Sequence, residues 1–169
     1  MKRLRKSDYV VDAVTAAKML LGKCLCRRLE DGTILKARIV ETEAYCGEGD
    51  TACHAHCGKT ERNAPMYEVG GIAYIYLCYG MHNLLNVVTG TKDYPEAVLI
   101  RGVDDHIGPG RVTKFLQIDR TLNRESLTVS KRLWIEDDGT PQLRFKATPR
   151  IGIAYATKRD QNRKWRFVV

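Results

Sequence analysis

The chain has 169 residues, a length typical of one domain that can bury a core without disulfide cross-links. Its 28 Lys and Arg residues outnumber 20 Asp and Glu, which gives a formal net charge of +8. No stretch is long and apolar enough to span a membrane, and the basic balance favours a polyanionic partner, nucleic acid first. Charge alone is equally compatible with a surface that only confers solubility.

Residues 1–22 begin with basic side chains but contain no signal-peptide apolar segment, because Asp8, Asp12 and Lys18 interrupt it. We therefore expect a protein of the cytoplasm, including the nucleoid, or of the nucleus in a eukaryote. In such compartments the six cysteines are expected to be reduced thiols.

The elements predicted in chain order form one α+β domain over residues 1–169, with flanking helices around a curved, mostly antiparallel sheet. Asp12 is expected to cap a helix that ends at Gly22, and Asp31-Gly32 predicts a hairpin between strands 23–29 and 38–45. Residues 46–71 predict a long loop. Further strands are expected at 72–79, 84–89 and 97–101, a helix after Gly108-Pro109-Gly110, and short strands from residue 133.

The strand Arg38–Tyr45, with the sequence RIVETEAY, places Glu41, Glu43 and Tyr45 on one face. Such a face indicates either a solvated strand edge or a functional site with two carboxylates and a ring. The strand by itself does not decide between these interpretations.

A cluster of thiols and imidazoles follows in the loop and consists of Cys46, Cys53, His54, His56 and Cys57. These are ligand types that zinc prefers, but the spacing fits neither common zinc pattern and adjacent residues cannot easily converge on one ion. We therefore predict a loop of polar site residues and no metal.

Two other features bear on function. Tyr74 and Tyr76 share a face of the strand at 72–79, where aromatic rings either fill a core or stack on bases. Gly108-Pro109-Gly110-Arg111 is typical of helix initiation and, less often, of a phosphate contact. Neither a Ser-His-Asp arrangement nor a phosphate-binding glycine loop is present, so no nucleotide cofactor is expected.

Five separated motifs stand out together. They are RIVETEAY, the following His54, RNAPMY, AYIYLCYGMHNLLNVV and AVLIR. In order and spacing they are similar to the motifs of the alkyladenine (3-methyladenine, or N-methylpurine) DNA glycosylase family, and the resemblance extends from about residue 20 to about residue 152.

The resemblance implies base-excision repair. Members flip a damaged purine (3-methyladenine, 7-methylguanine, hypoxanthine or ethenoadenine) out of double-stranded DNA and hydrolyse its N-glycosidic bond, without metal, cofactor or covalent intermediate. By motif position, Glu43 resembles the general base that activates water, and Arg101 the arginine that fixes this water. If Arg101 approaches Glu43, we expect it to lower the pKa of that carboxyl.

The same resemblance assigns the remaining site residues. Tyr45, His54 and Tyr76 match the pocket around the flipped base, and Asn86 matches the asparagine that excludes the amino group of guanine. Tyr79, assisted by Met81, matches the side chain that fills the gap in the duplex. Glu41 is expected to pair with a basic neighbour or face solvent, and the protein is expected to be a monomer.

Two alternatives remain. Glu41 and Glu43 have a spacing that suits an inverting glycoside hydrolase, although a basic protein is poorly matched to a neutral sugar. A nucleic-acid-binding module without turnover is the other alternative.

Overall fold

The long strand β3 (Ile34–Cys46) is the central element of the computed structural model, which describes residues 1–169. Its first half pairs with β2 (Cys24–Arg28) and its second half with β6 (Glu96–Val103). β10 (Arg166–Val168) pairs with β3 along the other side of residues 41–43. This segment therefore has strands on both sides, and its interpretation as a solvated edge is wrong.

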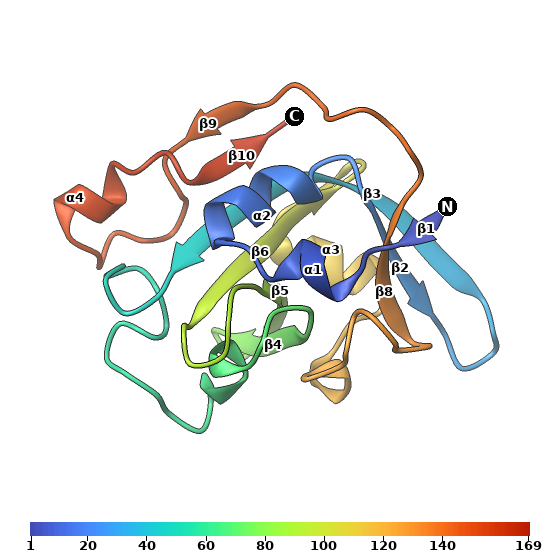
Figure 1. Cartoon of the computed structure of the whole chain (residues 1–169), viewed down its shortest axis with the longest axis horizontal. Helices are drawn as coiled ribbons and strands as arrows, with labels where there is room; N and C mark the ends of the chain where they lie inside the picture. Colours follow the sequence, from blue (N-terminus) through green and yellow to red (C-terminus); the bar gives the residue numbers. More distant parts are fainter.

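All strand pairs are antiparallel, and the sheet curves around the helices that cover it, which confirms the predicted α+β class (Figure 1). The main strand order is β1-β8-β2-β3-β6-β5-β4. The other strands are β1 (Lys2–Arg3), β4 (Ala73–Cys78), β5 (His82–Val88), β7 (His106–Ile107), β8 (Leu133–Asp137) and β9 (Lys146–Thr148). The helices are α1 (Lys6–Tyr9), α2 (Ala13–Leu20), α3 (Pro109–Phe115) and α4 (Lys158–Gln161), with 3-10 turns η1 (Ala64–Tyr67) and η2 (Arg120–Leu122).

Helix α2 lies across β3 and β6 and covers one face of the sheet (Figure 1). Its N-cap Asp12 accepts a hydrogen bond from the Thr15 amide at 2.9 Å, as the sequence predicts. The buried face of the helix consists of alanines and Leu20, and these small side chains let it approach the sheet closely. The Thr42 hydroxyl on β3 donates to the Ala17 carbonyl at 2.9 Å, which fixes helix against strand.

The segment between β3 and β4 is a long loop, as predicted, with η1 as its one regular turn. All six cysteines of the chain are unpaired. No three side chains of the His, Cys, Asp or Glu type are grouped so that they could hold a metal ion. No helix has the length and apolar character needed to cross a bilayer.

A buried ion pair ties this loop to the C-terminal segment. The Arg150 guanidinium, with no exposed side-chain surface, donates to both oxygens of Asp50 at 2.6 and 2.8 Å and to the Ala44 carbonyl at 2.9 Å. Asp50 also accepts from the backbone amides of Cys46 and Ala52. The pair therefore joins the end of β3, the loop and the strand pair β9–β10.

We predict that Asp50→Ala lowers the free energy of unfolding by about 3–5 kcal/mol, because Arg150 is left as a buried charge without a partner. Urea denaturation followed by circular dichroism measures the change. The control is Glu68→Ala, which breaks an exposed pair with Arg124 and should cost less than about 1 kcal/mol. A loss below about 1 kcal/mol for Asp50→Ala would contradict the anchoring role.

Candidate active site

A cleft of about 1430 Å³ opens beside the second half of β3. Its walls come from the β2–β3 turn, the β3–β4 loop, the turn between β4 and β5, the strand β6, the helix α3 with residues 117–119, and residues 151–155. Elements far apart in the sequence therefore meet at one cavity. Six of the predicted site residues line this cavity, namely Tyr45, His54, Tyr76, Tyr79, Met81 and Arg101.

Glu43 lies behind this cleft and has no exposed surface. Its Oε1 accepts a hydrogen bond from the Ile151 amide at 2.8 Å, and its Oε2 accepts one from the Tyr45 hydroxyl at 2.8 Å. Leu99, opposite Glu43 on β6, lines the cleft together with Ile151. Each carboxylate oxygen keeps a second lone pair, so Glu43 can still accept a bond from a water molecule.

Two arginines offset the negative charge on β3. The Arg101 Nε lies 3.1 Å from Glu41 Oε1 and 3.6 Å from Glu43 Oε1, so Arg101 is close to both carboxylates. Arg166 on β10 also donates to Glu41 Oε1. Two guanidiniums therefore balance two buried carboxylates, and Glu41, which is 1% exposed and absent from the cleft wall, serves as their shared partner.

The pKa of Glu43 is raised overall from its ordinary value, although Arg101 acts in the expected direction and lowers it. Burial of the carboxyl is the largest cause and raises the pKa. Arg101, the Ile151 amide and the Tyr45 hydroxyl all lower it, but together they do not offset the desolvation. The sequence predicts the effect of Arg101 but does not reveal that Glu43 is completely buried, which decides the net shift.

His54 and Tyr76 form an aromatic wall on the loop side of the cleft. Their ring centroids lie 4.5 Å apart in an edge-to-face arrangement, and Tyr74 lies 5.5 Å from Tyr76. His54 Nδ1 is 3.1 Å from the Tyr74 hydroxyl, a hydrogen bond that fixes the imidazole. Burial, followed by the charge of Arg62, lowers the pKa of His54, so the imidazole is neutral at pH 7.

Tyr45 forms another part of the wall. The Arg150 guanidinium stacks 4.8 Å from its ring centroid, and the Tyr45 hydroxyl is held by Glu43. A buried arginine therefore covers one face of the ring, and a buried carboxylate holds its hydroxyl. Burial and the nearby Glu43 carboxylate raise the pKa of Tyr45, which keeps the hydroxyl protonated as a donor.

Asn86 on β5 is buried, and its side-chain amide donates to the Tyr74 carbonyl at 3.3 Å. It pairs with Tyr74 across the strands and is not among the side chains that line the cleft. The structure places Asn86 beneath the aromatic wall, and its predicted role in excluding guanine stays a prediction.

Tyr79 and Met81 project from the β4–β5 turn with 89% and 71% of their surfaces exposed. Tyr79 and Gly80 both have positive φ, 50° and 67°, and the Met81 amide donates to the Cys78 carbonyl at 3.1 Å. This is a tight hairpin turn of the type that matches strand twist. The turn presents two large apolar side chains to solvent at the rim of the cleft.

The sequence interpretation missed three parts of this site. The Ile151 contact to Glu43 is made by a backbone amide, for which a sequence carries no signal. Arg150 directly follows Pro149, and nothing in its neighbourhood indicates burial. Tyr74 lies two residues before Tyr76 on the same face of its strand, and that spacing could have identified Tyr74 as part of the aromatic wall.

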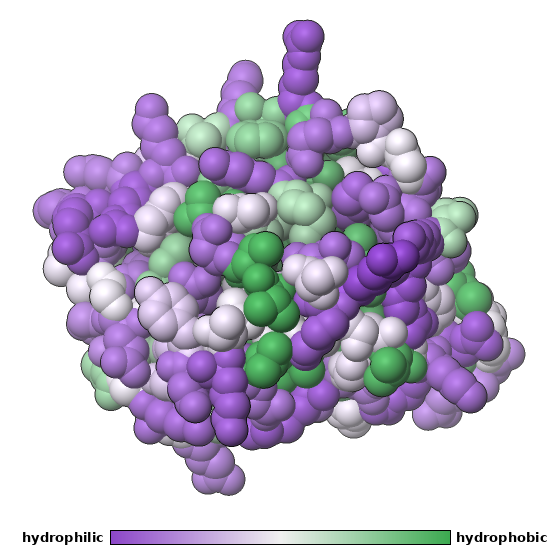
Figure 2. All heavy atoms as spheres, viewed as in Figure 1, coloured by the Kyte–Doolittle hydropathy of each residue, from purple (hydrophilic) through white to green (hydrophobic).

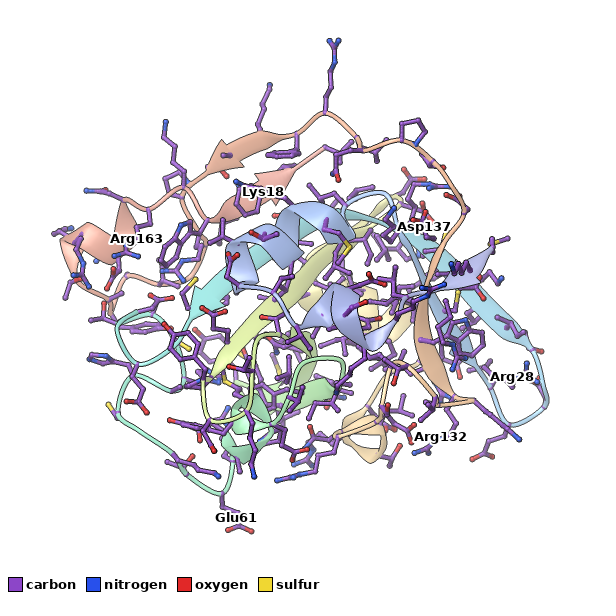
Figure 3. The ribbon with its side chains drawn as sticks, in the orientation of Figure 1. Lys18, Arg28, Glu61, Arg132, Asp137 and Arg163 are labelled. Carbon is purple, nitrogen blue, oxygen red and sulfur yellow. The ribbon has the colours of Figure 1, made fainter.

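Basic side chains are spread around the molecule. Hydrophilic residues cover most of the face in Figure 2, with smaller hydrophobic areas near its centre. Figure 3 shows Lys18 on α2, Arg28 at the end of β2, Arg132 just before β8 and Arg163 just after α4. The cleft itself has further cations along its walls, namely Arg27, Arg62, Arg101, Arg111 and Lys114.

Comparison with known proteins bears on this arrangement. The sequence model of the family described as methylpurine-DNA glycosylase (MPG) matches residues 7–107 and 103–169. A protein of Psychrobacter cryohalolentis is 48% identical, covering 90% of this chain and 85% of its own length. Proteins of Borrelia garinii subsp. bavariensis (42% identical, 95% and 92% covered) and Methanocella arvoryzae (41%, 99% and 92%) are also similar.

All three relatives carry the name "Putative 3-methyladenine DNA glycosylase". The family match covers nearly the whole chain, and identity exceeds 40% over most of each relative. The chain therefore belongs to the methylpurine-DNA glycosylase family of DNA-repair hydrolases.

Proposed function

We propose that this protein is a monofunctional glycosylase that excises damaged purines of the 3-methyladenine, 7-methylguanine, hypoxanthine and ethenoadenine class from double-stranded DNA. It acts as a monomer with one domain, in the cytoplasm or nucleoid, or in the nucleus of a eukaryotic cell. The observation that carries the proposal is the buried Glu43 carboxylate, held beside Arg101 at the back of a cleft with tyrosine walls.

Glu43 acts as the general base. A water molecule that hydrogen-bonds to Glu43 and is oriented by Arg101 attacks the sugar C1′, its proton passes to the carboxylate, and the bond electrons of C1′–N leave with the purine. A cationic alkylated purine leaves as a neutral base, whereas a neutral purine leaves as an anion and then takes up a proton from water. The carboxylate also stabilises the positive charge that develops on the sugar.

The aromatic wall holds the extruded base. Tyr45 and Tyr76 offer ring faces for stacking, which suits every purine and attracts cationic ones. His54, fixed by the Tyr74 hydroxyl, supplies one ring nitrogen for a hydrogen bond at the base or sugar. Tyr79, with Met81 beside it, fills the space that the base leaves in the duplex.

An inverting glycoside hydrolase is less well supported. Such an enzyme needs two carboxylates that reach the substrate, but Glu41 is buried and shared between Arg101 and Arg166. The two ion pairs of Glu41 support a role in holding Arg101 in position.

We predict that Glu43→Gln lowers the single-turnover excision rate of 7-methylguanine by at least about 100-fold, since a general base contributes that much or more. Affinity for the lesion duplex should stay within about threefold of the parent protein. Gel-based detection of alkali-labile abasic sites measures excision, and fluorescence anisotropy measures binding.

The matched control is Glu30→Gln, which removes one exposed carboxylate from the rim of the same cleft. It should retain excision. If the parent protein produced no abasic sites with either 7-methylguanine or hypoxanthine, only the binding-module alternative would remain. Normal excision by Glu43→Gln would disprove the base assignment.

We also predict that Tyr79→Ala weakens binding to a lesion duplex about tenfold, because one stacking ring is worth roughly 1–3 kcal/mol. Excision from a single-stranded lesion should change less. Tyr94→Ala, which removes a tyrosine that is 60% exposed and lies outside the cleft wall, is the control. Equal losses on duplex and single strand would argue against a wedge.

A further inference from the structure

Arg62 is a cation of the aromatic wall that the mechanism above does not use. Its guanidinium carbon lies 5.2 Å from the Tyr76 ring centroid, and its Nη2 donates to the Leu77 carbonyl at 3.3 Å. The hydrogen bond and the stacking contact together hold the charge against one face of the ring. Arg62 also lines the cleft together with Tyr76 and His54.

The charge of Arg62 is not neutralised by a neighbouring carboxylate. No Asp or Glu oxygen lies within 4.0 Å of its side-chain nitrogens, whereas the other guanidinium stacked on a cleft tyrosine, Arg150, is paired with Asp50. Glu41 and Glu43 are likewise balanced by Arg101 and Arg166. A neutral His54 adds no further charge at this wall.

A purine stacked on the free face of Tyr76 lies on the order of 10 Å from this guanidinium. At that distance, near the protein surface, a unit positive charge on the purine is repelled enough to change binding by about three- to tenfold. A neutral purine experiences no such repulsion. Arg62 therefore opposes the attraction that the tyrosine faces offer to cationic bases.

We propose that Arg62 is a specificity-determining residue that shifts the pocket from cationic toward neutral purine lesions. This inference rests on the proposed glycosylase function and concerns the binding step. When the C1′–N bond breaks, the charge on either kind of base becomes more negative by the same amount. Arg62 thus affects the rate of bond cleavage similarly for cationic and neutral purines. The preference between the two kinds of lesion therefore appears in the protein concentration at half-saturation.

The test compares duplexes that carry 7-methylguanine, which is cationic, or hypoxanthine, which is neutral. Single-turnover rates over a series of protein concentrations give a maximal rate and a half-saturation concentration for each lesion. The specificity for each lesion is its maximal rate divided by its half-saturation concentration. In Arg62→Gln, the specificity for 7-methylguanine relative to that for hypoxanthine should rise about three- to tenfold at low salt. The gain should shrink at high salt, because the charge is exposed and screened.

Two further variants separate this effect from general DNA affinity. Arg62→Lys keeps the charge and should keep the parent ratio. Arg111→Gln removes an exposed cleft arginine that stacks on no aromatic ring, so it should weaken binding to both lesion duplexes equally.

A ratio that stays within twofold in Arg62→Gln, or that rises equally in Arg111→Gln, would overturn the inference while excision continued. A parent protein that excises neither lesion would instead overturn the proposed function.

Discussion

The burial of the Glu43 carboxylate is the constraint on which the rest of the site depends. A carboxylate removed from water is strongly destabilised unless hydrogen bonds and opposite charges replace its hydration. Here the replacements are the Tyr45 hydroxyl on the same strand and two groups from distant parts of the chain, Arg101 on β6 and the Ile151 amide. The site exists only when all of them have folded together.

The C-terminal segment has a structural role that follows from this constraint. Residues 150 and 151 are adjacent, so the anchoring of Arg150 on Asp50 also brings the Ile151 amide to Glu43. β10 then supplies Arg166 to Glu41, which leaves the Arg101 guanidinium between the two carboxylates. The buried arginines and carboxylates thus neutralise one another in the interior. At the rim of the cleft, the positive charge of Arg62 beside the aromatic wall has no carboxylate partner.

Much of the fold was predictable, because its elements carry local signals. The cap at Asp12, the stop at Gly22 and the Asp31-Gly32 hairpin all lie where the sequence places them. The short elements β1, α1 and α4 were missed, since two to four residues give no periodicity. Of the site residues predicted from the motifs, six line the cleft, and Arg101 lies close to Glu43.

What the sequence could not supply was burial and its consequences. The alternation of RIVETEAY places Glu41 and Glu43 on one face, but only the pairing of β3 with both β6 and β10 explains why neither is solvated. Arg101 lowers the Glu43 pKa as predicted, but burial outweighs it and the net shift is upward. Contacts made by backbone atoms, such as the Ile151 amide, depend on the tertiary fold and have no residue-type signature.

The pH dependence of excision tests the central claim, that a buried Glu43 acts as the base. Because burial raises the pKa of Glu43, the carboxylate is lost at a higher pH than an ordinary glutamate, whose pKa is 4.5. The single-turnover rate for 7-methylguanine should therefore rise with pH to a plateau, with its midpoint above 4.5. Glu43→Gln should retain only a slow rate without this transition, with circular dichroism confirming the fold at each pH. A parent rate that is constant from pH 4.5 to 8, or the same transition in Glu43→Gln, would contradict the account.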